Sequence, residues 1–154
     1  SELNMNDDKI KESYDYYLGL IYLGQNKYEE ILKTLGEGNL SPRIVKLLAI
    51  AIINVENNGL YYYILKRLNN FNFSKYDEII KNLCEYATIK VNSGNNVIKL
   101  QNFLKNKIYK MLKYSFEYTL YEAIIKEMLL FNIKCSKYKE GCFLMLNYLN
   151  KVDK

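Results

Sequence analysis

Apolar residues along this chain recur at intervals of three and four, the spacing that places them on one face of an α-helix. Clusters rich in asparagine and glycine interrupt the pattern and divide the chain into about eight segments of helical length. These clusters lie at residues 25–26, 36–39, 57–59, 69–72, 92–96 and 132–136. The alternation of apolar and polar residues that is typical of strands is absent. We therefore predict an all-α protein in which neighbouring helices form antiparallel hairpins and bury their apolar faces against each other.

Two helix starts carry capping residues. Ser41 is followed by Pro42, so a capping hydroxyl stands next to a proline at the first helical position, where the missing N–H costs nothing. Ser74 is followed three residues later by Asp77, a weaker form of the capping box. We expect one helix to begin at Pro42 and another shortly after Ser74.

The longest apolar stretch covers residues 47–55, in which Asn54 is the one polar residue. A helix that spans a bilayer needs roughly 20 apolar residues, so this run is far too short to act as an anchor. It predicts instead a helix that is buried in the core, and the chain is expected to lack a membrane span.

The composition favours one globular domain and excludes much of enzyme chemistry. The chain has 154 residues, of which 49% are hydrophobic and 25% charged, so we expect a single helical domain over residues 1–154, with the polar residues 1–8 flexible. It contains no histidine, so the usual general base, nucleophile partner and metal ligand are all missing. Its 7 glycines form no phosphate-binding loop. We predict no enzymatic activity, no cofactor and no metal site.

The cysteines indicate a reducing compartment. Cys84, Cys135 and Cys142 form an odd set without the Cys-x-x-Cys spacing of redox or zinc motifs. We therefore expect reduced thiols in a cytoplasmic protein. Cys84 stands beside Glu85 in a helical segment, and the neighbouring carboxylate would raise the pKa of the thiol rather than lower it.

Charge is distributed unevenly along the chain. The net charge is +5, yet residues 1–40 contain 8 acidic residues and 4 lysines. No acidic residue occurs between Glu85 and Glu117. In a helix over residues 97–113, apolar residues would occupy one side and lysines the other. The candidate contact residues on this basic face are Lys99, Lys107, Lys110 and Lys113.

Tyrosine is the second candidate contact residue, with 16 in the chain. Residues 14–17 and 61–63 each hold three of them. Three consecutive helical residues point about 100° apart, so some of these phenols must reach the surface. Exposed tyrosine is enriched at protein interfaces. The candidate contact residues in these clusters are Tyr14, Tyr17, Tyr61 and Tyr62.

The first predicted hairpin resembles the tetratricopeptide repeat. Residues 18–22 read Leu-Gly-Leu-Ile-Tyr, which matches the Leu-Gly-x-x-Tyr run on the first helix of that repeat. The resemblance covers about 25 residues, and the motif does not recur 34 residues later. The chain also departs from the family at several positions; Pro42, for example, lies one residue before the position of the proline in the repeat. It implies a degenerate right-handed superhelix, as the alternative to a compact bundle, that holds a peptide or another subunit. The residues given structural roles are Leu18, Gly19, Tyr22 and Pro42.

Three functions are consistent with these features. The first is a non-enzymatic adaptor or complex subunit that binds a protein partner through the exposed tyrosines and the lysine face. The second is a nucleic-acid or ribosome-associated binder that uses the basic helix 97–113, which would weaken steeply with added salt. The third is a viral host-modulating protein on the helical fold of the apoptosis regulators, suggested by chain length and by a residue usage typical of A/T-rich genomes. The sequence leaves the oligomeric state open.

Overall fold

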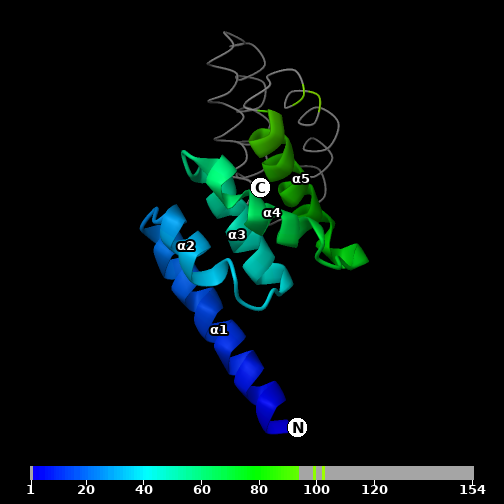
Figure 1. Ribbon diagram of the computed structural model, residues 1–154. Coiled ribbons are helices and arrows are strands. Elements are labelled where there is room, and N and C mark those ends of the chain that lie inside the picture. The colour runs from blue at the N-terminus through cyan, green and yellow to red at the C-terminus, as the bar shows by residue number, and fades with distance from the viewer. Residues whose placement is uncertain (1, 94–98, 100–101, 103–154) are drawn as a thin grey trace, which may run out of the picture. The chain divides into compact units, whose positions relative to one another are not determined.

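The computed structural model describes residues 2–93, together with Lys99 and Asn102. Residues Ser1–Gly94 form a compact unit of their own. Its elements are α1 (Glu2–Gly24), α2 (Tyr28–Leu35), α3 (Pro42–Asn54), the 3-10 turn η1 (Asn58–Tyr61), α4 (Tyr62–Asn69), the 3-10 turn η2 (Lys75–Asp77) and α5 (Glu78–Ser93). Five helices pack as a compact bundle in this part of the chain, which holds no strand (Figure 1). The predicted all-α class is confirmed for these residues.

The turn between α1 and α2 closes at the asparagine that the sequence marks as a break. Asn26 adopts a positive φ of 56°, a conformation that asparagine tolerates better than most residues. The N–H of Lys27 donates to the carbonyl of Tyr22 at 2.9 Å, and that of Asn26 to the carbonyl of Leu23 at 3.1 Å. This pair of bonds is the Schellman arrangement that ends many helices. It reverses the chain so that α2 runs back along α1 (Figure 1).

Helix α3 is the centre of the bundle. Ser41 caps it, because its hydroxyl accepts the N–H of Ile44 at 3.3 Å, and Pro42 occupies the first turn as predicted. Every residue from 47 to 53 is buried, and α3 packs against α1, α2, α4 and α5. The prediction of a core helix is confirmed. Its last turn is closed by Lys90 of α5, whose ammonium donates to the carbonyl of Ile53 at 2.7 Å.

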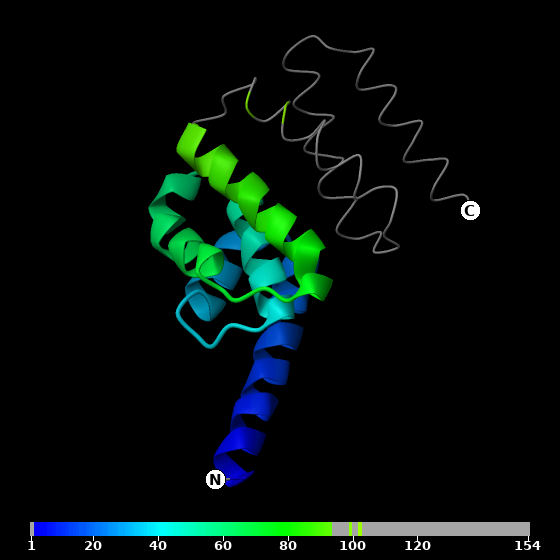
Figure 2. The same cartoon turned by 90° about the vertical axis from the view of Figure 1, so that its right-hand side faces the viewer.

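The segment before α5 contains the predicted capping box. The N–H of Ser74 donates to Oδ2 of Asp77 at 3.1 Å, and the N–H of Tyr76 donates to the hydroxyl of Ser74 at 3.2 Å. This turn leads into α5, which lies across α3 and beside α4 (Figure 2).

One arginine ties the loop between α2 and α3 to α4. The guanidinium of Arg67 donates to the carbonyls of Gly36 and Gly38, with 2.7 Å between its Nη2 and the Gly38 oxygen. The planar fork of arginine holds two acceptors in a fixed geometry, whereas the donors of a lysine all converge on one nitrogen. The bond fixes a glycine-containing loop 31 residues away in the chain.

The start of the chain was expected to be flexible, and this stays a prediction. Residues 2–8 continue α1 as regular helix. They contain no glycine or proline, and their acidic residues suit the positive end of the helix dipole. Most of the lysine face and the break at residues 132–136 lie outside the described residues, as do Cys135 and Cys142. The single-domain prediction for residues 1–154 stays a prediction.

Candidate interaction surface on helix α1

A glycine on one face of α1 allows this helix to pack closely against α2 and α3. Gly19 is buried, and a methyl group at this position would lie 2.7 Å from Cδ1 of Leu47 in α3 and 3.0 Å from Cδ1 of Leu35 in α2. The absence of a side chain lets α1 approach both helices this closely without displacing either leucine. Leu18 and Tyr22, the other residues in the tetratricopeptide-like run, are half-buried.

Hydrogen bonds between side chains hold the middle of α1 against the start of α3. The guanidinium of Arg43 donates from Nε to Oε1 of Glu12 at 2.7 Å and from Nη2 to Oε2 at 2.6 Å. The hydroxyl of Ser41 donates to the same carboxylate at 2.8 Å. Arg43 also lies over the ring of Tyr16, 4.1 Å from its centroid. These contacts fix how α1 leaves the bundle.

The hydrogen bond from Arg43 holds the pKa of the Glu12 carboxyl below its ordinary value, with a smaller contribution from Ser41. Glu12 therefore stays ionised to lower pH than an ordinary glutamate. The sequence pattern did not reveal this pair, because 31 residues separate its members.

The opposite side of α1 carries an exposed apolar stripe. Four side chains are more than half exposed: Ile10 at 67%, Tyr14 at 66%, Tyr17 at 61% and Ile21 at 56%. At 100° per residue they share one face, roughly opposite the face that holds Gly19. We call these four residues the α1 stripe. A helix that packs on one face usually carries polar residues on the opposite face. Because α1 carries apolar and aromatic residues there instead, the stripe indicates a contact surface.

The stripe lies partly on a portion of α1 that stands away from the other helices. In both views the first half of α1 extends beyond the rest of Ser1–Gly94 (Figures 1 and 2). Tyr14 and Tyr17 were predicted as contact residues, and the structure shows both at the surface. Ile10 and Ile21 were missed, because an isolated isoleucine in a helical pattern suggests core rather than surface.

The second tyrosine cluster divides between core and surface. Tyr62 is 46% exposed, and its contact role stays a prediction. Tyr61 is only 8% exposed, because it ends η1 and turns inward at the start of α4. Its burial leaves almost no surface for contact, so the predicted contact role of Tyr61 is not supported. Its neighbour Tyr63 is exposed instead.

Of the predicted lysine face, the structure describes Lys99 alone, and its side chain is exposed. Lys107, Lys110 and Lys113 lie outside the described residues. The basic helix 97–113 therefore stays a prediction, together with its binding to nucleic acid.

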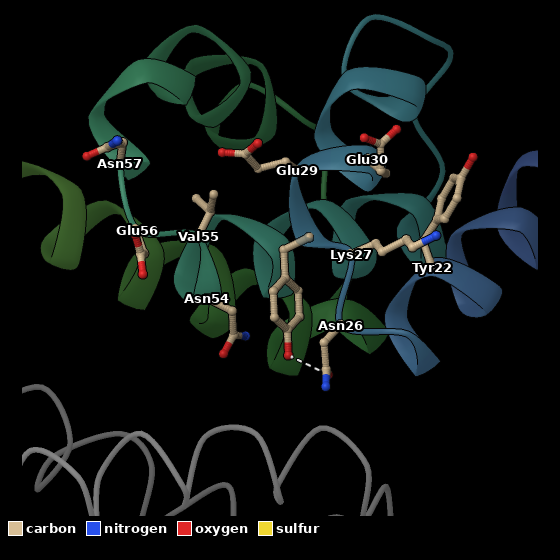
Figure 3. A pocket seen from close by; sticks show the side chains of 10 residues that line it. Tyr22, Asn26, Lys27, Glu29, Glu30, Asn54, Val55, Glu56 and Asn57 are labelled. Atoms are coloured by element: carbon tan, nitrogen blue, oxygen red, sulfur yellow. Dashed lines mark hydrogen bonds between the residues drawn. The ribbon is translucent and has the colours of Figure 1, made fainter.

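A hollow with a volume of about 580 Å³ lies where the α1–α2 turn meets the end of α3 (Figure 3). Tyr28 donates its hydroxyl to the side-chain oxygen of Asn26 at 3.1 Å on its wall. The carboxylates of Glu29, Glu30 and Glu56 line it without converging on one point (Figure 3). The hollow is open to solvent and holds no arrangement of nucleophile and base.

Within residues 2–93, no group of histidine, cysteine and acidic side chains is placed to hold a metal ion. Cys84 is the free thiol of this region and is buried. Burial, together with the nearby charge of Glu85, raises the pKa of the Cys84 thiol to about 12. The prediction that Glu85 would raise this pKa is confirmed, and burial is the larger cause.

None of the described helices is long and apolar enough to cross a membrane. Comparisons with protein-family models, with curated proteins and with solved structures gave no match for this chain.

Proposed function

We propose that this protein is a non-enzymatic adaptor or complex subunit that binds a protein partner through the α1 stripe. The observation that carries the proposal is the exposure of four large apolar side chains along one face of a helix whose other face is already packed. Tyrosine and isoleucine at helical spacing offer the kind of surface into which another helix packs. The proposal includes a degenerate helical-repeat architecture resembling tetratricopeptide repeats, supported by the buried Gly19 at the junction of α1, α2 and α3.

The charge of α1 favours a protein over a nucleic acid at this surface. Residues 2–24 hold 5 acidic residues and 2 lysines. A phosphate backbone is repelled by such a surface, and its affinity depends on cationic contacts. Lys11 is already paired with Asp15 at 2.9 Å.

The test is an affinity capture from the native source with the tagged full chain, with and without nuclease. The variant is Tyr14→Gln with Tyr17→Gln, which removes both rings and keeps a good helix former. The matched control is Tyr63→Gln with Tyr76→Gln, two exposed tyrosines outside α1. We expect a protein that is retained by the wild type and by the control, lost from the α1 variant, and unaffected by nuclease.

Two results would contradict the proposal. One is a partner that binds the α1 variant as well as the wild type, which would place the contact elsewhere. The other is recovery of material that nuclease removes, which would favour the nucleic-acid function of the lysine face.

A further inference from the structure

The α1 stripe has the same residues and spacing in both directions along the helix. Ile10, Tyr14, Tyr17 and Ile21 are separated by four, three and four positions, and the residue types mirror each other about the midpoint between Asp15 and Tyr16. A two-fold axis through that midpoint brings Tyr14 of one copy onto Tyr17 of another, and Ile10 onto Ile21. Such self-complementarity is what an isologous interface between identical subunits requires.

The spacing also suits the packing of two helices along their length. Alternating intervals of four and three place side chains as knobs into the holes of a facing helix that crosses at about 20°. From Ile10 to Ile21 the stripe is about 17 Å long at a rise of 1.5 Å per residue. Four layers of side chains therefore form from four residues of each copy.

Charge favours the antiparallel orientation of the two helices. Asp7 continues the stripe one heptad before Tyr14, so a parallel pair would set Asp7 against Asp7 at the seam. An antiparallel pair places each Asp7 beyond the end of the stripe of the other copy. Lys11, the charged residue that flanks the seam, then lies opposite Leu20, which is itself partly exposed.

The area available reaches what a dimer needs. Aromatic side chains bury 150 to 250 Å² each, so the exposed parts of the stripe and of Leu20 offer about 600 Å² per copy. A symmetric pair then buries about 1,200 Å², the lower end of the range for specific interfaces. An interface of this size predicts a dimer that forms at micromolar concentration rather than an obligate one.

We propose that the partner of the α1 stripe is a second copy of this chain, paired antiparallel through α1. The inference rests on the proposed function of the same surface and names its occupant. The two tyrosines form the centre of the interface and the isoleucines its ends.

The test is sedimentation equilibrium of the full chain from about 1 to 500 µM, the range in which a small interface dissociates. We expect the average mass to rise from 18.3 kDa toward twice that value. Tyr14→Lys and Tyr17→Glu, each alone, are expected to weaken the dimer at least about tenfold. Tyr76→Lys is the control, since Tyr76 is 84% exposed and lies outside α1. Circular dichroism verifies that each variant remains folded.

Mixing the variants tests the orientation. Tyr14→Lys mixed with Tyr17→Glu places a lysine opposite a glutamate in an antiparallel pair, so the mixture is expected to associate more tightly than either variant alone. Tyr14→Lys mixed with Tyr14→Glu would place a lysine opposite a glutamate only in a parallel dimer. We therefore expect this mixture to associate no more tightly than either variant alone.

Three results would overturn the inference: a wild type that stays monomeric throughout, a dimer that the stripe variants leave unchanged, or recovery by the second mixture instead of the first. A monomeric wild type whose captured partner is still lost from the Tyr14→Gln, Tyr17→Gln variant would reject the second copy and leave the proposed function standing. A monomer without an α1-dependent partner would reject both.

Discussion

Replacing Gly19 by leucine tests whether α1 depends on close packing against α2 and α3. A Cβ at this position would lie 2.7 Å from Cδ1 of Leu47, roughly 1 Å inside the optimal carbon separation of about 3.5 to 4.0 Å. The atoms it meets are the ends of leucine side chains, which can move for a methyl group. A whole leucine side chain needs more space than those movements provide, so α1 must shift away from α3.

Such overpacking costs about 1 to 3 kcal/mol. Gly24 supplies the matched control, because it ends the same helix and a Cβ there meets nothing within 4 Å. Leucine at either position gains helix propensity of up to about 1 kcal/mol over glycine. We therefore expect Gly24→Leu to be neutral or stabilising, and Gly19→Leu to be less stable than Gly24→Leu by about 1 to 3 kcal/mol.

The measurement is thermal and urea unfolding of the full chain, followed by circular dichroism at 222 nm, the helical band. For a chain of this size, 1 kcal/mol corresponds to about 2 to 4 °C in Tm, so the two variants should differ by about 2 to 12 °C. Equal Tm values for Gly19→Leu and Gly24→Leu would refute the close approach of α1 to Leu35 and Leu47.

Three further predictions concern single side chains of the bundle. Cys84, with its pKa raised to about 12, should resist alkylation in the folded protein near pH 8 and react on unfolding, so peptide mass spectrometry that finds it labelled in the native state would contradict its burial. Folding lowers the pKa of Glu12, so the stabilisation by its ionised carboxylate is complete above the ordinary pKa of 4.5 and is lost as the pH falls through the lowered value. The difference in Tm between the wild type and Arg43→Gln should therefore shrink at low pH. A difference that stays constant with pH would refute the ion pair between Glu12 and Arg43. Ile52 is fully buried, so Ile52→Asp should prevent folding while Ile52→Val costs about 0.5 to 1.5 kcal/mol, and a folded aspartate variant by circular dichroism would place the residue outside the core.

The helices of the described region follow from local sequence. Ser41 and Ser74 cap helices where the pattern predicts, and the breaks fall at the predicted asparagine and glycine clusters. These features depend on residues within four positions of one another, so a local pattern contains them. The burial of residues 47–53 is equally local, because a continuous apolar run has no polar face to expose.

The sequence also predicted part of the candidate surface. Tyr14, Tyr16 and Tyr17 point in different directions around the helix and cannot all face the core, and Tyr14 and Tyr17 are the ones exposed. Which face of α1 turns inward depends on Gly19 and on the bond between Glu12 and Arg43, and that bond joins residues 31 positions apart. Because periodicity alone does not show which face of α1 turns inward, it could not assign Ile10 to the surface.

The positions of the two arginines could have supported a further prediction from the sequence. The chain has 22 basic residues, of which Arg43 and Arg67 are the arginines. Both make two or more bonds to acceptors about 30 residues away, one to a carboxylate and the other to two carbonyls. Lysine offers charge without the planar fork, so in a chain where lysine is the usual cation an arginine marks a position that needs two bonds in fixed geometry. The bonds of Arg67 fix the loop before α3, and the bonds of Arg43 to Glu12 join α1 to the first turn of α3 and so set the direction in which α1 leaves the bundle.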